Sequence, residues 1–311
     1  MTVGRWGATS TGALSITNAG VLTNNYLVVG RGTSSAEEVP SARAHGSTGT
    51  VSVSCSGSAI HLGVDTVLSA PAISIGREGG SGSVTLSDQA VMTIDGSAAT
   101  SGYPGYPYLT VGRDQGRVAG AASHLTVDDA RLTLTGNSQG GLLTLGWGPG
   151  ADGTLTIQNG AIVTIDAGGL GCCMTVGHKG TGTLTVDGAE LIFTDIKTGG
   201  VTLGHQPGSV GSLHITNGGK VTVQGSIWSG MTIGREGHGI LEITGGGQLV
   251  ARGLPSGGSG NLLFGGNNAT ETGGFFDVLI SGPGSTLSLE GPDASFTLGY
   301  KPGASGTMTV S

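Results

Sequence analysis

Five of the nine arginines in this 311-residue chain directly follow a recurring four-residue string. The string is an apolar residue, usually a threonine, a second apolar residue and a glycine, and it occurs ten times. In chain order, the residue after the glycine is Arg5, Arg31, Arg77, Arg113, Trp147, His178, His205, Arg235, Gly266 or Tyr300. A guanidinium group binds carboxylates and phosphates through paired N–H donors. If the strings lie at equivalent places in a repeat, the arginines form a cationic ladder that can bind acidic glycans or lipopolysaccharide phosphates.

The same arginines have an alternative, structural role. An acidic residue directly follows three of them, as Glu78, Asp114 and Glu236. Local ion pairs with these acids, and packing of the arginine stems over neighbouring repeats, would use the side chains within the protein. Both interpretations of the ladder stay open at the level of the sequence.

Two insertions interrupt the repeat and contain most of the remaining residues that could bind a ligand. The segment 97–108 holds Tyr103, Tyr106 and Tyr108, three of the five tyrosines, together with two prolines. Such a stiff aromatic loop can stack on sugar rings, or its rings can lie back over the flank of the protein and shield it. The segment 31–48 contains a strongly polar loop. Insertions of this kind often carry function in repeat proteins, because the strands are committed to stacking.

Strings that match enzyme motifs lack the structural setting that their chemistry needs. Residues 136–140 read Gly-x-Ser-x-Gly, and residues 148–153 read Gly-x-Gly-x-x-Gly. Neither string is followed by the helix that would support a nucleophile or receive a pyrophosphate. Acidic residues are scattered, so neither an acid–base pair nor a calcium site is expected. We therefore predict no catalytic residue and no cofactor.

The three cysteines, Cys55, Cys172 and Cys173, do not form a disulfide framework, because their number is odd and two are adjacent. Only His178 lies near a cysteine at a spacing that suits metal ligands, so we expect no metal site. The cysteines are interpreted as small packing or turn residues.

The recurring strings also define the element that positions the candidate residues. Apolar residues occupy the slots one and three before the glycine in every copy, and the slot between them is threonine in seven copies and serine in one. This alternation predicts a short strand with one buried face and a polar, β-branched outer face. A second apolar pair follows each string, as in Leu155/Ile157, and a looser third pair follows in several repeats, as in Val163/Ile165. Asn-Gly and Asp-Gly pairs between the second and third runs predict sharp corners.

Three such strands per repeat predict an all-β fold, a single-stranded, right-handed parallel β-helix of about nine to ten rungs. Each strand would stack on the same strand of the next repeat, so that the apolar pairs form continuous ladders. A β-propeller is the rival fold, but its blades need four strands and longer repeats than most of these, which are 26 to 46 residues apart. We expect residues 1–311 to be one continuous β-helix segment of a longer chain, since the sequence opens within the repeat pattern.

The composition argues against several classes of protein. Only 11% of the residues are charged and the formal net charge is −7, so no nucleic-acid partner is expected. No apolar run approaches the ~18 residues of a membrane-spanning helix, so this segment is not expected to insert into a membrane. Glycine supplies 64 residues without a collagen-like period, which is typical of turns between many short strands.

The repeat resembles those of autotransporter passenger domains of Gram-negative bacteria. The shared pattern is the recurring string, a short polar turn, a Gly-Thr-Leu-Thr run and an Asn-Gly or Asp-Gly corner, and residues 143–165 and 174–193 are the best examples. The resemblance covers essentially the whole chain. It implies a secreted β-helical stalk at the bacterial cell surface, often an adhesin, whose signal peptide and anchor lie outside this segment. Three cysteines are unusual for such passengers.

Three functions follow from these observations. The first is an adhesin-like surface stalk that displays loops for contact with glycans, host cells or other bacterial surface components. The second is a structural fibre subunit that associates with itself head-to-tail through uncapped β-helix ends. The third is a β-helical enzyme acting on polysaccharides.

Overall fold

The computed structural model describes residues 1–5, 10–32, 47–63, 73–96, 109–113, 121–136, 142–168, 174–253, 260–266, 272–292 and 294–311, with the backbone alone at residues 5, 197–199 and 226–229. In this part of the chain the regular elements are 27 β-strands. It contains no helix with the length and apolarity needed to cross a membrane.

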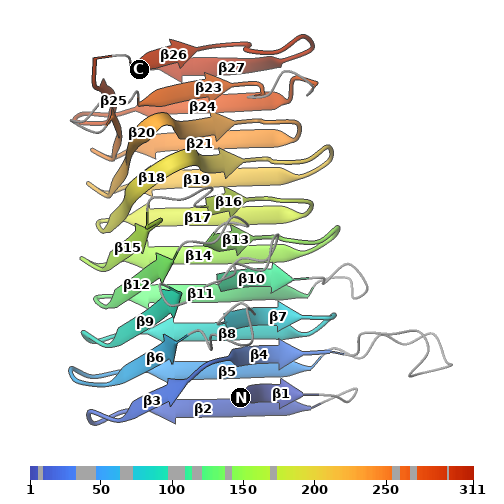
Figure 1. The fold of residues 1–311 in the computed structure, drawn as a ribbon, viewed down its shortest axis with the longest axis vertical. Helices are drawn as coiled ribbons and strands as arrows, with labels where there is room; N and C mark the ends of the chain where they lie inside the picture. Colours follow the sequence, from blue (N-terminus) through green and yellow to red (C-terminus); the bar gives the residue numbers. More distant parts are fainter. Residues whose placement is uncertain are drawn as a thin grey trace, which may run out of the picture.

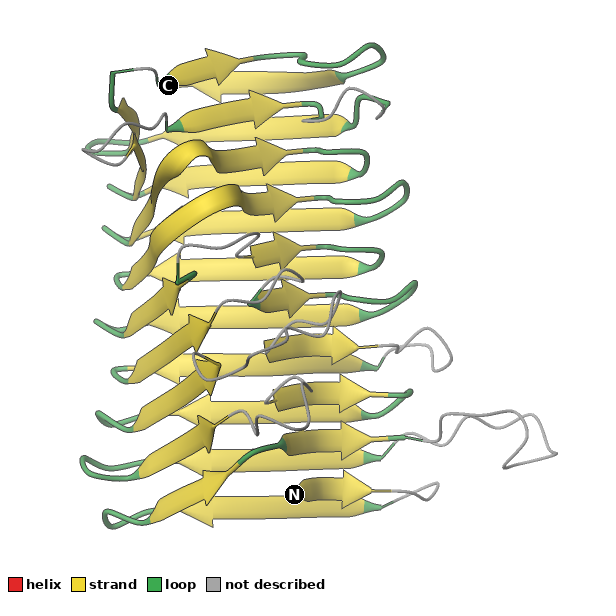
Figure 2. Ribbon diagram, viewed as in Figure 1, coloured by secondary structure: helices red, strands yellow, loops and turns green. Residues whose placement is uncertain are grey.

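The strands form three faces, and successive rungs stack along one axis (Figures 1 and 2). The first face holds the strands of the recurring string, namely β1 (Thr2–Arg5), β4 (Leu27–Arg31), β7 (Ile73–Arg77), β10 (Leu109–Arg113), β13 (Leu143–Leu145), β16 (Met174–Val176), β23 (Asn261–Phe264) and β26 (Ser295–Thr297). The second face holds β2 (Thr11–Ile16), β5 (Thr48–Val53), β8 (Ser81–Leu86), β11 (Ala122–Asp128), β14 (Asp152–Gln158), β17 (Thr181–Asp187), β19 (Val210–Thr216), β21 (His238–Thr244), β24 (Phe275–Ser281) and β27 (Ser305–Val310). The third face holds β3 (Val21–Asn24), β6 (Ala59–Gly63), β9 (Val91–Gly96), β12 (Arg131–Gly136), β15 (Ile162–Asp166), β22 (Gln248–Gly253) and β25 (Thr286–Glu290).

Two long strands, β18 (Glu190–Leu203) and β20 (Lys220–Ile233), run from the third face into the first. They join these two faces into one sheet of 17 strands, beside the 10-stranded second face. The pairing of β18 with β20 shifts register near Ile196, where the chain turns from one face to the other. The corner between the third and first faces is therefore continuous strand in these two rungs.

Equivalent residues of successive rungs lie side by side in parallel pairing. On the second face, Asp152–Gln158 pairs residue by residue with Thr181–Asp187, which pairs in turn with Val210–Thr216. On the first face, Leu109 pairs with Leu143. The second face alone counts ten such strands, so the predicted parallel β-helix of nine to ten three-strand rungs is confirmed.

Alternating side chains of each strand fill the interior. In β14 and β17 every second residue is buried, and the predicted apolar pair Leu155/Ile157 is fully buried. Burying one aliphatic side chain of this size contributes about 1.5–3 kcal/mol. The buried side chains form one core cluster along the axis. Because the interior is filled by packed apolar side chains, any binding or catalytic side chains must lie on the corners and the outer faces.

The glycine of the recurring string makes the corner after the first strand. Gly146 has a φ of +66°, a conformation that side chains with a Cβ rarely adopt. A Cβ at this position would also meet the backbone of Thr181 in the next rung. The corner therefore needs glycine for two reasons, its backbone conformation and the close approach of the neighbouring rung.

The outer side of the first face differs from the sequence-based expectation in one respect. Most of its residues are polar, as predicted, but Ser74 and Thr110 are 0% exposed, and Thr144, Thr175 and Thr202 are buried as well. Among the described residues, the hydroxyl groups of Ser74 and Thr110 make no hydrogen bond. This face is therefore covered rather than presented to solvent.

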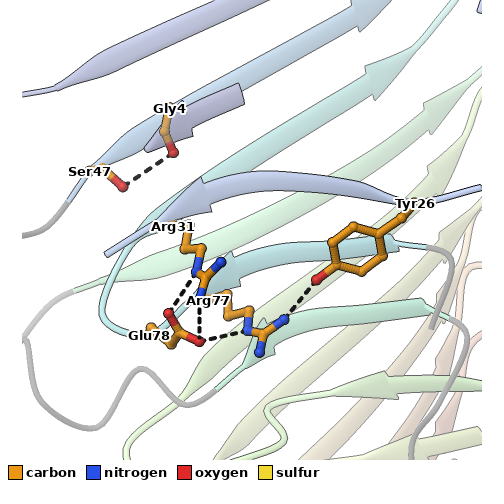
Figure 3. Close-up of polar contacts among 6 residues, drawn as sticks. All are labelled: Gly4, Tyr26, Arg31, Ser47, Arg77 and Glu78. Carbon is orange, nitrogen blue, oxygen red and sulfur yellow. Dashed lines mark hydrogen bonds and ion pairs between the residues drawn. The ribbon is translucent and has the colours of Figure 1, made fainter. Parts of the chain in front are cut away.

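Part of this cover comes from the corner residues themselves. Arg77 ends β7 and Tyr26 precedes β4, yet the Arg77 Nη1 donates a hydrogen bond of 2.7 Å to the Tyr26 hydroxyl (Figure 3). The two side chains together reach along the outer side of the strands. A long side chain after the glycine can thus fold back over the face that its own strand presents.

Candidate functional site

The residues that follow the recurring glycine line up along one corner, one in each rung, and we call Arg31, Arg77, Arg113, Trp147, His178, His205 and Arg235 the corner column. In the strand ladder, Arg31 pairs with Arg77, which pairs with Arg113. Backbone hydrogen bonds carry the ladder onward, as from the Trp147 N–H to the Gly112 carbonyl at 2.9 Å. The predicted alignment of these residues is therefore present, although only its first part is a run of arginines.

In that first part, two guanidinium groups share one carboxylate (Figure 3). Arg31 donates from Nε and Nη2 to the two oxygens of Glu78 at 2.7 and 3.3 Å, and Arg77 donates from Nε to Glu78 Oε1 at 2.9 Å. The Glu78 side chain is only 11% exposed, against 26% and 25% for the two arginines. Such shielded, charge-assisted bonds are stronger than surface pairs. Local pairing, the structural alternative for the ladder, is thus what these two arginines do.

The surroundings of Arg77 keep it charged. Burial disfavours the cation, but Tyr26 and Glu78 together outweigh burial and raise the pKa of Arg77 above its ordinary value. Glu78 itself has a φ of +55°, so the turn after β7 adopts a left-handed conformation at the residue that receives both guanidinium groups. The turn thereby aims the carboxylate back at the column.

In the middle of the column, planar rings replace the arginines. Trp147 and His178 stack with centroids 4.6 Å apart and planes 10° apart, and His178 and His205 stack at 4.8 Å and 16°. Arg235 Nη1 then lies 2.8 Å from His205 Nε2. These separations match the ~4.8 Å between neighbouring strands, so the β-helix itself sets the stacking distance.

Hydrogen bonding indicates which ring nitrogens of the two histidines donate and which accept. A guanidinium only donates, so the Nε2 of His205 must accept, and this ring is neutral with its proton on Nδ1. The Nδ1 of His178 lies 3.2 Å from the Trp147 carbonyl, which only accepts. Burial is the main cause that lowers the pKa of His178; the hydrogen bond to the Trp147 carbonyl opposes this, and the charges of Lys179 and Arg235 lower the pKa further. The middle of the column is therefore an uncharged stack at neutral pH.

Several sequence-predicted site residues lie outside the described part of the chain. These are Tyr103, Tyr106 and Tyr108, the remainder of the insertion 97–108, residues 33–46 of the insertion 31–48, and the side chain of Arg5. Their ligand-binding roles stay predictions. Arg113 is buried in the column.

A second candidate site is a surface depression of about 430 Å³ at the corner between the second and third faces. Gln89, Asp129 and Arg131 lie around it. The sequence reasoning did not single out these residues, because no motif surrounds them. The available signal was the length of the corner, which differs between neighbouring repeats.

The outer side of the second face carries two histidine–carboxylate pairs. His214 Nδ1 lies 2.8 Å from Glu242, and His238 Nε2 lies 2.9 Å from Asp277, which also accepts a 2.7 Å hydrogen bond from Thr307. The bonds from Thr307 and His238 lower the pKa of Asp277. Within the described residues no three histidine, cysteine or acidic side chains are grouped so as to hold a metal ion.

Comparisons with protein-family models, with curated proteins and with solved structures give no match to this chain. The function is therefore argued from the geometry and the repeat pattern.

Proposed function

We propose that this chain is a stalk-like segment of a bacterial surface protein, secreted to the cell surface, which displays its corners and loops for contact with cells or glycans. One observation carries the proposal, namely the in-register stacking of ten rungs on a continuous apolar core. Nine steps of about 4.8 Å give an axial length of about 43 Å. A rod of this kind separates what it presents from the surface to which it is attached.

The distribution of polar and charged side chains supports a role in displaying groups for contact. The interior is apolar, while the corner column, the corner depression and the histidine–carboxylate pairs all lie on the outside. The bacterial surface as location, and adhesion as the activity, rest on the resemblance of the repeats to autotransporter passengers. The proposed ligands are glycans or proteins of host cells or of other bacteria.

An adhesion assay with the purified chain tests this proposal. Fluorescent beads coated with the protein are offered to epithelial cells, to Gram-negative bacteria and to arrays of neutral and acidic glycans. We expect the coated beads to bind at least one of these surfaces. The bound beads should remain attached after the surface is washed with fresh buffer. Beads that bind none of them would refute the adhesive role and leave a purely structural one.

Two sets of variants locate the contact. Replacement of Tyr103, Tyr106 and Tyr108 by alanine tests the tyrosine loop, and replacement of Arg31 and Arg77 by glutamine tests the corner column. Arg252→Gln is the matched control, since Arg252 pairs with Glu290 on an exposed part of the third face. Unchanged binding by a variant removes that group from the proposed contact.

A specific observation also favours the fibre as a second candidate. The tenth rung exposes Phe296, Leu298 and Val310, and Phe296 packs against Phe264 of the rung before it. Core positions that face solvent at one end offer a surface on which a further rung can stack. Sedimentation velocity over a range of concentrations tests this candidate, because a rod that stays monomeric at every concentration would exclude it.

A further inference from the structure

The corner depression lies where the second face turns into the third, and its volume is about 430 Å³. Successive rungs line it, with Gln89, Val91, Asp129, Ala130, Arg131 and Ile162 among the lining residues. Small-molecule sites usually measure ~300–1,000 Å³, so the depression is large enough for a small ligand.

The depression has a simple cause in the lengths of three neighbouring corners. Four residues separate the paired positions Leu86 and Val91 in one rung, and four separate Ile157 and Ile162 two rungs later. In the rung between them, only three residues separate Val127 from Arg131. The shorter corner is recessed between two longer ones, and the strands on either side hold the recess in place.

The lining has an apolar base and a polar rim. Val91 and Ile162 are half-buried and flank Arg131 in the strand ladder, and Ala130 is buried, so an aliphatic side chain lies on each side of the Arg131 stem. Gln89, Asp129 and Arg131 are exposed around the depression. This combination suits a ligand with one apolar side and hydrogen-bonding groups along its edge.

The polar groups of the rim are available to a ligand. Within the described part of the chain, no hydrogen bond or ion pair engages the side chains of Gln89, Asp129 or Arg131. Arg31 and Arg77 of the corner column, in contrast, are both held by Glu78. No sequence motif marks the rim residues, although the structure leaves their side-chain donors and acceptors unused.

The rim also determines the charge of the ligand. Arg131 supplies only donors, Asp129 supplies only acceptors, and Gln89 supplies both. The opposite charges of Arg131 and Asp129 cancel, so an anionic ligand attracted by the first is repelled by the second. A neutral molecule with several hydroxyl groups can satisfy both, because each hydroxyl donates and accepts.

We propose that the corner depression binds one pyranose unit of a neutral saccharide. The C–H face of the sugar lies on Val91 or Ile162 beside the stem of Arg131, which separates these two residues in the strand ladder, and its hydroxyl groups bond to Asp129, Arg131 and Gln89. The inference rests on the proposed function as a glycan-contacting surface protein, and adds the place and the class of the ligand.

Saturation-transfer NMR with the full chain tests the inference. The probes are the methyl glycosides of glucose, galactose and mannose in both anomeric forms, followed by titration calorimetry with the one that gives the strongest signal. Arg131→Ala removes the guanidinium donors, and Asp129→Asn removes the charge of the carboxylate and replaces one acceptor oxygen by an amide donor. Asp129 has a φ of +44°, which asparagine tolerates, so the second variant keeps the corner intact.

Lys220→Ala is the matched control, because Lys220 occupies the same register position as Arg131 three rungs further along and lies outside the depression. We expect both rim variants to weaken binding about tenfold or more, and the control to leave it unchanged. Saccharide binding that survives both rim variants would overturn this site while leaving the adhesive role standing. Absence of a saturation-transfer signal from all six glycosides would also overturn the proposed site, independently of the result of the bead adhesion assay.

Discussion

At the scale of single residues, the corner column combines neutral and charged planar groups at a fixed spacing. His178 and His205 stack at 4.8 Å beside the cation of Arg235, and the His205 ring accepts a bond from that cation. A proton on His205 would place a like charge in contact with Arg235, and a proton on His178 would be disfavoured by the charges of Lys179 and Arg235. The stability of the folded protein therefore depends on pH. The sign of this dependence follows from the difference in the pKa of His178 between the folded and the unfolded chain.

Acid should weaken the folded protein through His178. Because burial lowers the pKa of His178 in the folded protein, the unfolded chain takes up its proton first as the pH falls below about 6.5. The stability contributed by this residue is complete above that pH and declines below it. The His178→Phe variant keeps a stacking ring. Between about pH 7 and about pH 5, we expect its midpoint of thermal unfolding to drop less than that of the parent chain. His124→Phe, an exposed position on the second face, should drop as much as the parent chain, and equal slopes in all three would contradict the account.

Glu78 should matter more than an ordinary surface acid. Glu78→Gln leaves Arg31 and Arg77 facing each other without a counter-charge, and we expect a loss of about 1–3 kcal/mol in urea unfolding. Glu290→Gln breaks the pair with Arg252, whose side chains are 46% and 45% exposed, and should cost less than about 1 kcal/mol. Similar losses in the two variants would show that the shared carboxylate has no special role.

At the scale of the elements, the corners hold the rungs at their spacing. Gly146 and Gly160 both have a positive φ, +66° and +77°, but only at Gly146 would a Cβ meet the next rung. Nothing lies within 4 Å of a Cβ built on Gly160. The first corner is therefore tightly packed and the second is open.

Alanine substitutions should separate backbone strain from steric contact. Gly160→Ala carries the cost of its φ alone, about 1 kcal/mol, whereas Gly146→Ala adds a collision with the backbone at Thr181 and should cost about 3 kcal/mol or more. Urea unfolding of the two variants measures the difference. A Gly146→Ala protein as stable as Gly160→Ala would mean that the first corner has room to move.

Local alternation predicted the elements well, because the buried slots repeat in every rung. Leu155 and Ile157 illustrate this, since their burial depends only on strand period and stacking. The burial of Thr110 on the outer side of the first face was not predictable, because strand alternation assigns that side to solvent. The corner depression at Arg131 depends on a difference between three corners, so no single repeat reveals it.

At the scale of the whole molecule, the tenth rung ends the described ladder with apolar side chains exposed. Leu298 belongs to the slot that is buried in the earlier copies of the string, and Val310 to the equivalent slot of the second face. Phe275 is also exposed, at 59%, but it lies on the side of the second face rather than at its end. The different positions of these residues allow end-to-end stacking to be distinguished from association through apolar side chains on the sides of the β-helix.

If copies associate end to end, charge at the last rung should prevent it. We expect Leu298→Asp with Val310→Asp to abolish concentration-dependent association in sedimentation velocity, since a carboxylate between stacked rungs would be buried without a partner. Phe275→Asp should leave the association unchanged. Loss of association in the Phe275 variant, or its persistence in the double variant, would place the contact elsewhere.

The pairing of each strand with its counterpart one rung away has a kinetic consequence. Leu155 pairs with Leu184, only 29 positions along the chain, and this separation is set by the repeat and not by the total length. The entropy lost in closing each new loop therefore stays small as the molecule lengthens. A finished rung offers its free edge as a template, so the chain can fold progressively while it is still emerging from a ribosome or a pore.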